Sequence, residues 1–336
     1  MKFLIVGLGS MGKRRIRNLR RLNAGEIAGF DLTAERRDDA AKTYGIKVFD
    51  DLSDALSRFA PDALVVSTPP DLHLGFAIRA LKEGKHVFCE AGTTTEGIPE
   101  VLALAERGRL VAAPSCTMRF QHSIKKMKSL LTAGTIGKIL AYTHHSGQYL
   151  PDWHPFEDYR AFYASRRETG ACREIVAFEL TWLNWLMDAE VRTVTALVGK
   201  VSTLDCDIDD VYQMALRYSN GALCHLMIDA ISRVATRSLR ILGETGTLEW
   251  NAGARLLRHY DAATQVWTDY PEPVPVIEPG YSGMSAEGMY DEEMDAFVRA
   301  CRGEASYPHS FAEDLQILTT LVDGEKESAR LISNKA

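Results

Sequence analysis

A glycine-rich turn follows a short apolar run at the start of the chain. The run is Phe3–Val6, and the turn reads Gly7-Leu8-Gly9-Ser10-Met11-Gly12. Helical spacing follows over Lys13–Leu22, so strand, turn and helix come in the order that a dinucleotide site requires. The first glycine allows the tight turn, the second lets the backbone approach a pyrophosphate, and the third lets the helix pack against the strand. The free N–H groups and the positive end of the helix dipole then face the phosphates.

An acidic residue closes the next expected strand. Glu26–Phe30 has a β-type pattern, and Asp31 lies about 20 residues past the glycines, where a carboxylate can bind a ribose 2′-hydroxyl. Asp31 favours NAD, because a carboxylate repels the 2′-phosphate of NADP. Arg36 and Arg37 follow closely and could pair with that phosphate, so NADP stays open as the alternative. The other interpretation of both arginines is a solvated helix face.

Short apolar runs alternate with amphipathic helical patterns over residues 1–120. This alternation predicts right-handed βαβ units and a parallel sheet, with the ligand at the carboxyl ends of the strands. The predicted helices include Thr33–Thr43 and Leu72–Glu83. The predicted strands are Lys2–Val6, Glu26–Phe30, Ile46–Phe49, Ala63–Ser67, His86–Cys89 and Leu110–Ala113.

The pattern changes after Arg119, where longer β-type runs follow one another. The predicted strands are Lys138–His145, Val194–Val201, Asp210–Tyr218, Ala222–Ile231, Ser238–Leu242, Thr247–Trp250 and Leu256–Tyr260. The predicted helices are Ile124–Leu131, Gly170–Met187, Met289–Cys301 and Phe311–Ser328, and Thr264–Gly283 is a proline-containing connector. We therefore predict an α/β protein. Residues 1–120 form the dinucleotide-binding domain, and residues 121–336 form an α+β domain with a large, mostly antiparallel open sheet. The closing helices could pack back on the first domain.

Composition excludes several classes of partner. The 336 residues carry a net charge of −6 without a long charged block, which argues against nucleic acid or a membrane surface. Most basic side chains of the first helix are expected to point at water. The apolar run at the start of the sequence is expected to be a buried strand. Six scattered cysteines indicate reduced thiols. The cytoplasm is therefore the expected compartment. No spacing of His, Cys, Asp and Glu predicts a metal site. The basic residues of the first helix, most of which are expected to face water, are Lys13, Arg14, Arg15, Arg17, Arg20 and Arg21.

Six motifs occur in a fixed order along the chain. They are the glycine turn with Asp31, Ser67-Thr68-Pro69-Pro70 before His73, Cys89-Glu90, Arg119-Phe120, Gly134-Thr135-Ile136-Gly137 and Gly243-Glu244-Thr245-Gly246-Thr247. In this order the chain resembles the glucose–fructose oxidoreductase and inositol dehydrogenase family (Gfo/Idh/MocA). The resemblance implies a Rossmann domain, a nicotinamide cofactor and a sugar-like or polyol substrate. It also implies a homodimer or homotetramer formed through one face of the C-terminal sheet.

The resemblance supplies candidate cofactor contacts. Besides the glycine turn and Asp31, these contacts include residues that end the fourth and fifth strands. Glu90 lies on the nicotinamide side, and its alternative role is a structural cap. The complete set is Gly7, Leu8, Gly9, Ser10, Met11, Gly12, Asp31, Ser67, Thr68, Pro69, His73 and Glu90.

Two positions depart from the family pattern. The family commonly has Glu-Lys-Pro after the fifth strand, with a lysine that assists catalysis, whereas this chain has Glu90-Ala91-Gly92. The family also carries Asp and His four residues apart on a helix, and the corresponding residues here are Glu174 and Phe178. The usual proton-transfer pair therefore cannot be carried over.

Another residue must then handle the hydroxyl proton. The loop from Gly147 to Arg160 is the best source, because it concentrates aromatic, acidic and basic groups that suit a sugar. His154 is the leading candidate, with a purely structural histidine as the alternative. Glu174 could orient His154 or act as a base, or it could simply complement the helix dipole. Arg173 completes the catalytic candidates, and the substrate candidates are Tyr149, Trp153, Arg160 and Glu179.

Three functions remain open at this point. The first is an NAD-dependent oxidoreductase acting on a sugar, polyol or nucleotide-sugar hydroxyl or keto group. The second is a redox-neutral epimerase or lyase that retains NAD, favoured by the loss of both proton carriers. The third is an NAD-binding sensor without turnover. Fold analogy does not decide among them, because function resides in the site.

Overall fold

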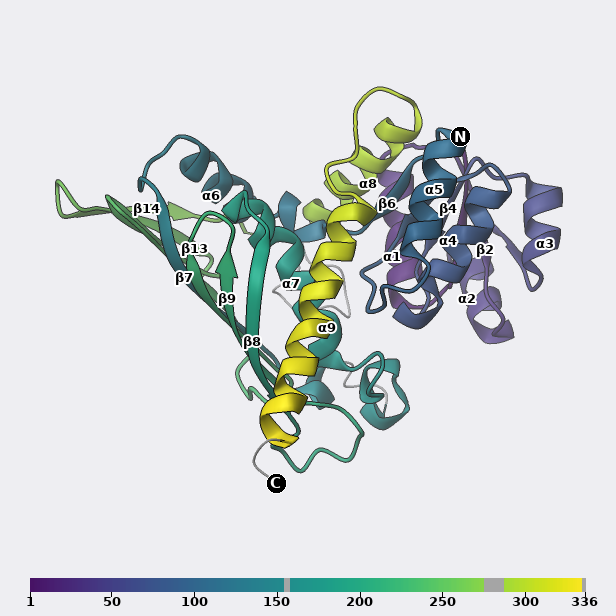
Figure 1. Ribbon diagram of the computed structural model, residues 1–336. Coiled ribbons are helices and arrows are strands. Elements are labelled where there is room, and N and C mark those ends of the chain that lie inside the picture. Colours follow the sequence, from purple (N-terminus) through teal and green to yellow (C-terminus); the bar gives the residue numbers. More distant parts are fainter. Residues whose placement is uncertain (154–157, 275–286, 334–336) are drawn as a thin grey trace. The chain divides into compact units, whose positions relative to one another are not determined.

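The computed structural model describes residues 1–153, 158–274 and 287–333, which form two compact units (Figure 1). Unit 1 comprises Met1–Thr117 and Glu287–Leu315. Unit 2 comprises the described residues of Met118–Ala286 and Gln316–Ala336. Within the described ranges, no helix combines the length and the apolar character needed to cross a bilayer.

Unit 1 is built on a six-stranded parallel sheet in the order β3-β2-β1-β4-β5-β6. Strand β1 pairs with β2 on one side and with β4 on the other, so the strand order reverses beside β1. Sheets of this topology bind ligands outside the carboxyl ends of the strands at the reversal point. The strands are β1 (Lys2–Val6), β2 (Glu26–Phe30), β3 (Lys47–Phe49), β4 (Ala63–Val66), β5 (His86–Cys89) and β6 (Ala112–Pro114).

Helices cover both faces of this sheet. The units β1–α1–β2 and β4–α4–β5 progress in opposite directions, so right-handed crossovers put α1 and α4 on opposite faces. Helix α1 packs against α8, and α4 packs against α5. The core contains fully buried Phe3, Ile5, Ile16, Phe88 and Phe297. The helices are α1 (Ser10–Arg21), α2 (Ala34–Tyr44), α3 (Leu52–Asp54), α4 (His73–Lys82), α5 (Ile98–Gly108) and α8 (Glu287–Cys301).

Unit 2 is built on an eight-stranded sheet in the order β14-β13-β12-β11-β7-β10-β9-β8. All neighbours pair antiparallel except β7 and β10, which are parallel. The expectation of a parallel-sheet domain followed by a large, mostly antiparallel sheet is therefore confirmed. The strands are β7 (Ile139–Gly147), β8 (Val191–Gly199), β9 (Val211–Tyr218), β10 (Leu223–Asp229), β11 (Thr236–Gly243), β12 (Gly246–Asn251), β13 (Leu256–Asp261) and β14 (Val266–Pro271).

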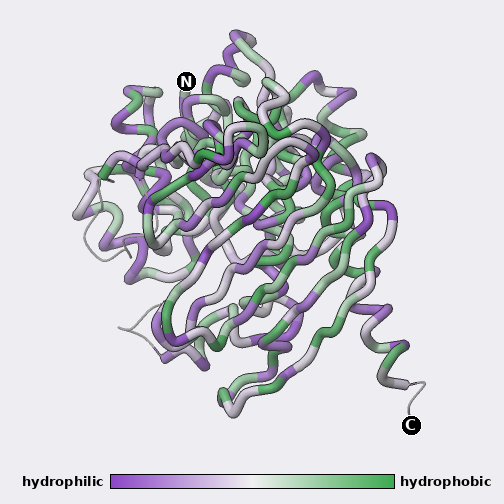
Figure 2. Tube along the Cα trace, turned by 90° about the vertical axis from the view of Figure 1, so that its left-hand side faces the viewer, coloured by the Kyte–Doolittle hydropathy of each residue, from purple (hydrophilic) through white to green (hydrophobic). Residues whose placement is uncertain are grey.

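One face of this sheet is covered by helices and the other is exposed. Buried and exposed residues alternate along β9, and Figure 2 shows the matching alternation of hydropathy along the strands. Helix α6 (His122–Thr132) contacts β13, and α7 (Ala171–Met187) contacts β9 and β10. Helix α9 (Phe311–Ser333) reaches β8 through Ser328, whose hydroxyl accepts a hydrogen bond from the Val198 N–H. Helices α7 and α9 can be followed along the sheet in Figure 1.

Two elements differ from the sequence prediction. The expected connector over Thr264–Gly283 is wrong at its start, where β14 occupies Val266–Pro271. Aromatic residues favour strands, and Pro271 ends an edge strand, where its missing N–H costs no ladder hydrogen bond. Helix α5 was not predicted, although Pro99 suits the first turn of a helix.

Candidate functional site

The three glycines between β1 and α1 have different surroundings. Gly7 has a φ of +93°, and a Cβ there would lie 2.7 Å from the Ser67 carbonyl oxygen. A Cβ on Gly12 would lie 1.9 Å from the Gly7 carbonyl oxygen. A Cβ on Gly9 would meet nothing within 4 Å, and its φ of −73° suits any residue. The fold therefore requires Gly7 and Gly12, whereas Gly9 leaves space open in front of α1.

Asp31 is tied to the glycine turn. Its Oδ2 accepts a hydrogen bond from the Leu8 N–H and its Oδ1 accepts one from the Thr33 N–H, each at 2.8 Å. Arg36 lies 3.7 Å from Oδ2 with an exposed side chain. Arg37 instead donates to the carbonyls of Asp31 and Leu32, so the solvated-face interpretation is wrong for Arg37. Asp31 thus fixes the turn and keeps further lone pairs for a ligand.

The residues that end β4 form a short connection to α4. The Ser67 hydroxyl donates to Glu90 at 3.4 Å, which links the ends of β4 and β5. His73 is buried, and its Nε2 lies 2.7 Å from the Thr68 carbonyl oxygen. Burial lowers the pKa of His73, so the neutral ring donates that hydrogen bond. His73 therefore fixes the backbone beside Pro69, and its side chain is hydrogen-bonded to the Thr68 carbonyl of the protein itself.

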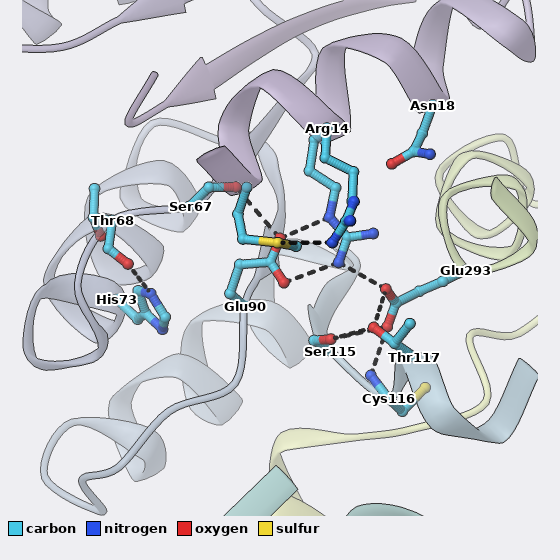
Figure 3. A network of polar contacts seen from close by, with 12 residues as sticks. Arg14, Asn18, Ser67, Thr68, His73, Glu90, Ser115, Cys116, Thr117 and Glu293 are labelled. Atoms are coloured by element: carbon cyan, nitrogen blue, oxygen red, sulfur yellow. Dashed lines mark hydrogen bonds and ion pairs between the residues drawn. The ribbon is translucent and has the colours of Figure 1, made fainter. Parts of the chain in front are cut away.

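Glu90 belongs to a buried ionic network (Figure 3). Arg15 donates to both carboxylate oxygens of Glu90, at 2.6 and 2.9 Å, and to Glu293 at 2.7 Å. The side chains of Arg15 and Glu293 are fully buried, whereas that of Glu90 is 14% exposed. Glu293 also accepts hydrogen bonds from Ser115, the Cys116 N–H and Thr117. Glu90 is therefore the end of this network that reaches the surface.

The expectation that the basic residues of α1 mostly face water is wrong for two of them. Arg14 and Arg15 are buried, because α8 presents carboxylates to α1. Arg14 pairs with Glu287 at 3.0 Å. A buried arginine requires a partner of this kind, since an unpaired buried charge is costly. Helical spacing could have indicated that Arg15 is buried, because it lies three residues after Gly12 and therefore on the same face of the helix.

These features of unit 1 fit a dinucleotide. Helix α1 begins beside the open space at Gly9, and its first turn carries no acid to repel phosphates. Asp31 at the end of β2 would hold the adenosine ribose. Ser67, Thr68 and Glu90 follow the strands on the other side of β1, where the nicotinamide half would lie. The structure thus brings most of the predicted cofactor contacts to one edge of the sheet.

Unit 2 contains a separate buried polar cluster around Glu179. Its carboxylate lies 2.9 Å from His144 Nε2 and 2.8 Å from Arg237, and it accepts a hydrogen bond from Trp182 Nε1. Burial opposes ionisation of Glu179, but Arg237 and His144 outweigh it and hold its pKa at about 2. The Arg237 guanidinium lies 5.8 Å from the Phe178 ring centre and its side chain is 16% exposed. Sequence reasoning missed Arg237, which no local pattern connects to Glu179.

The remaining predicted residues of unit 2 lie in different contacts. Arg173 pairs with Glu325 at 2.8 Å, and Glu174 accepts a hydrogen bond from the Tyr163 hydroxyl at 3.2 Å. Arg160 is exposed and pairs with Asp158 and Asp205, which occupy its guanidinium. The Tyr149 ring lies 3.6 Å from the Arg233 guanidinium. Trp153 is partly buried and is the last residue of a described range. His154 lies outside the described residues.

The adjacent histidines of β7 point to opposite faces of the sheet, as alternation requires. His144 lies on the covered face against Glu179, and His145 Nε2 lies 2.7 Å from Asp229. Asp229 also accepts hydrogen bonds from the N–H groups of Ile231 and Ser232, so it caps the turn after β10. Both histidines are therefore held by carboxylates.

Comparison with known proteins agrees with this arrangement. A model of an oxidoreductase family with an NAD-binding Rossmann fold (GFO_IDH_MocA) matches residues 1–114, and the model of its C-terminal domain matches residues 124–249. Inositol 2-dehydrogenase of Acidothermus cellulolyticus is 24% identical over 97% of this chain and 92% of that protein. Inositol 2-dehydrogenase 3 of Saccharopolyspora erythraea is 27% identical over 194 residues, which span 56% of this chain and only 54% of that protein.

A solved structure shares the fold. The WlbA dehydrogenase from Bordetella pertussis, in complex with NADH and UDP-GlcNAcA, superposes with a TM-score of 0.81 at 22% identity. The match covers 98% of this chain and 96% of that one. With two models of one family matching successive parts of the sequence, the chain belongs to the Gfo/Idh/MocA family of NAD-binding oxidoreductases.

Proposed function

We propose that this protein catalyses NAD-dependent hydride transfer at a hydroxyl or keto carbon of a sugar, polyol or nucleotide sugar. The observation that carries the proposal is the open space at Gly9 in front of α1, with Asp31 fixed at the end of β2. The relatives support the substrate class, since they include dehydrogenases of inositol and a dehydrogenase crystallised with a nucleotide sugar.

The residues of unit 1 would bind and orient the cofactor. The N–H groups of the first turn of α1 would donate to the pyrophosphate, and Asp31 would accept from ribose hydroxyls with the lone pairs that Leu8 and Thr33 leave free. The same carboxylate would reject a 2′-phosphate, which makes NAD the expected cofactor over NADP. When bound, NAD supplies the hydride acceptor or, when reduced, the hydride donor.

The hydroxyl proton needs a protein group, and we propose Glu174 and His154 for this task. Glu174 already accepts a hydrogen bond from the Tyr163 hydroxyl, which supports its carboxylate as an acceptor for a hydroxyl proton. Arg173 is proposed as a positioning residue, since its ion pair with Glu325 anchors the start of α7. Because Ala91 and Phe178 replace the usual proton carriers, these residues must supply the proton transfer that hydride chemistry requires.

The test is a substrate panel with the purified protein. Inositols, hexoses, hexuronates and UDP-sugars should be screened for NADH formation at 340 nm. Glu174→Gln and His154→Ala should each lower kcat by about 100-fold, while exposed Glu168→Gln serves as the control and should leave kcat unchanged. Tight NAD binding without any NADH signal would contradict the proposal. Solvent deuterium uptake without net NADH would instead establish a redox-neutral reaction.

We also propose that the protein forms a homodimer or homotetramer in the cytoplasm. The uncovered face of the large sheet supports the first part, because it carries exposed Leu197, Leu223 and Leu242. Six cysteines without paired spacing support the second, since thiols persist in a reducing compartment.

A further inference from the structure

The network of Arg15, Glu90 and Glu293 carries an unbalanced charge. Two carboxylates share one guanidinium, so the three side chains together carry −1 when both acids are ionised. Glu293 is fully buried and accepts hydrogen bonds from Ser115, Thr117, the Cys116 N–H and Arg15. The excess negative charge is therefore fixed in the interior of unit 1.

The network is also rigid. The Arg15 guanidinium lies 4.7 Å from the Phe88 ring centre and 5.3 Å from that of Tyr290, so both rings pack near it. Its two hydrogen bonds to Glu90 are parallel and fix the plane of that carboxylate. Figure 3 shows Glu90 and Glu293 as parts of one continuous set of contacts. Glu90 consequently presents a carboxylate of fixed orientation, partly exposed, at the end of β5.

The sheet order relates this carboxylate to the two halves of a dinucleotide. The glycine turn follows β1, Asp31 follows β2, and Glu90 follows β5 on the opposite side of β1. If Asp31 holds the adenosine ribose, the other half extends towards β4 and β5. The nicotinamide ring is cationic in NAD⁺ and neutral in NADH, so a fixed negative charge distinguishes the two forms.

We propose that the buried Arg15–Glu293 pair fixes Glu90 as the exposed end of a negative network that makes the site bind NAD⁺ in preference to NADH. The inference rests on the proposed function, because it requires the cofactor to lie with its nicotinamide half towards β5. Arg15 and Glu293 are positioning residues in this scheme. Glu293 holds Arg15 in place and adds its charge to the network, without touching the cofactor.

The test compares the affinities of the two cofactor forms. The dissociation constants of NAD⁺ and NADH are measured by calorimetry for the intact protein and its variants. Glu90→Gln should change the ratio Kd(NAD⁺)/Kd(NADH) about tenfold in favour of NADH. Glu293→Gln should shift the ratio in the same direction by about threefold, because its charge lies farther from the ligand. A fully buried side chain would thus alter redox-state preference.

Two controls separate charge from structure. Ser115→Ala removes a hydrogen bond to Glu293 without changing charge, and Asp291→Asn removes a partly exposed carboxylate of α8 that pairs with Arg21. Both should leave the ratio unchanged. If Glu293→Gln fails to fold, Glu90→Gln still tests the charge of the network. Arg15→Lys keeps the charge but cannot make both parallel hydrogen bonds to Glu90, so it should move the ratio towards NADH, and an unchanged ratio would overturn the positioning role of Arg15.

The outcomes are distinguishable from those of the proposed function. Absence of binding for both cofactor forms would overturn the proposed function itself. Binding of both forms with a ratio that Glu90→Gln and Glu293→Gln leave unchanged would overturn only the inference about the network. A shift of equal size in Ser115→Ala would also overturn it, because the effect would then be structural.

Discussion

Gly9 and Gly12 lie three residues apart in the same turn, yet their surroundings differ. A Cβ on Gly12 would collide with the Gly7 carbonyl oxygen, whereas a Cβ on Gly9 would enter open space. A side chain at Gly12 would therefore disturb the folded chain itself, whereas a side chain at Gly9 would collide only with a bound ligand. Single residues of this turn can therefore report on folding and on binding separately.

Gly9→Ala should fold normally and bind NAD at least about tenfold more weakly, because the added methyl group occupies the space for the pyrophosphate. Gly12→Ala should lose about 3 kcal/mol of stability or more, since backbone cannot move aside as a side chain can. Thermal unfolding and calorimetric titration with NAD measure the two effects. Gly75→Ala on α4 is the matched control, with no atom within 4 Å of its Cβ. Unchanged NAD affinity in Gly9→Ala would refute the placement of the pyrophosphate.

Asp31→Asn should raise NADP affinity relative to NAD affinity by about tenfold, since it removes a charge that repels the 2′-phosphate and releases Arg36. NAD affinity should fall as well, because the amide can accept only one of the two backbone hydrogen bonds from Leu8 and Thr33. Titration of both cofactors measures the ratio. Arg36→Gln in the Asp31→Asn background should cancel the gain for NADP, and persistence of that gain would exclude the role given to Arg36.

At the scale of elements, charged contacts decide how α8 joins unit 1. Arg14 of α1 pairs with Glu287 of α8, Arg15 pairs with Glu293, and Arg21 pairs with Asp291. The two helices are more than 260 residues apart in sequence, so neither could be recognised as the other's partner from local patterns. The same contacts explain why arginines of α1 are buried in spite of their charge.

The connection from β4 to α4 should make stability depend on pH. Burial lowers the pKa of His73, so the folded chain refuses a proton that the unfolded chain accepts below its ordinary pKa of 6.5. Stability is therefore full above about pH 6.5 and falls as the pH drops towards the lowered pKa. His86, whose pKa burial also lowers, adds to the slope.

His73→Gln should keep a donor to Thr68 and reduce this loss of stability. Urea unfolding midpoints between about pH 7.5 and pH 5.5 measure the slope. His225→Gln, on the exposed face of β10, should leave the slope as it is in the unaltered chain. An identical slope in His73→Gln would assign the pH dependence to other groups.

At the scale of the whole molecule, the helices that the structure describes in unit 2 leave one face of the large sheet uncovered. Leu223 of β10 and Leu242 of β11 both lie opposite Ala141 of β7, so they form one apolar row across three strands. Exposed apolar rows of this kind mark association surfaces. A second copy of the chain, related by two-fold symmetry, would cover the face with the same residues.

Leu223→Glu together with Leu242→Glu should shift the protein to a monomer, because association would bury two carboxylates without partners. Light scattering coupled to size-exclusion chromatography measures the mass. Arg217→Glu changes the charge beside the row and keeps both leucines. It tests whether any added carboxylate on this face is enough to dissociate the oligomer. An unchanged mass in the double variant would locate assembly elsewhere.

The cofactor half of the site could be predicted from sequence because its determinants are local. Glycine requirements, the strand before them and Asp31 all follow from steric and electrostatic rules that act within about 30 residues. The buried clusters could not be predicted in this way. Glu179 of helix α7 was a candidate substrate contact, but its partners His144 and Arg237 come from strands β7 and β11, and the Glu293 that completes the Arg15 network lies 278 residues away.

The sequence by itself determined that a dinucleotide cradle lies at the start of the chain and that a mostly antiparallel sheet follows it. Backbone sterics and period-two patterning are short-range, so one segment is enough to specify each. Only the tertiary structure decided which charged residues are buried and with what partners. The energy of a buried charge depends on the groups that distant segments bring within hydrogen-bonding distance, and for Arg15, Glu90 and Glu293 those segments are α1, β5 and α8.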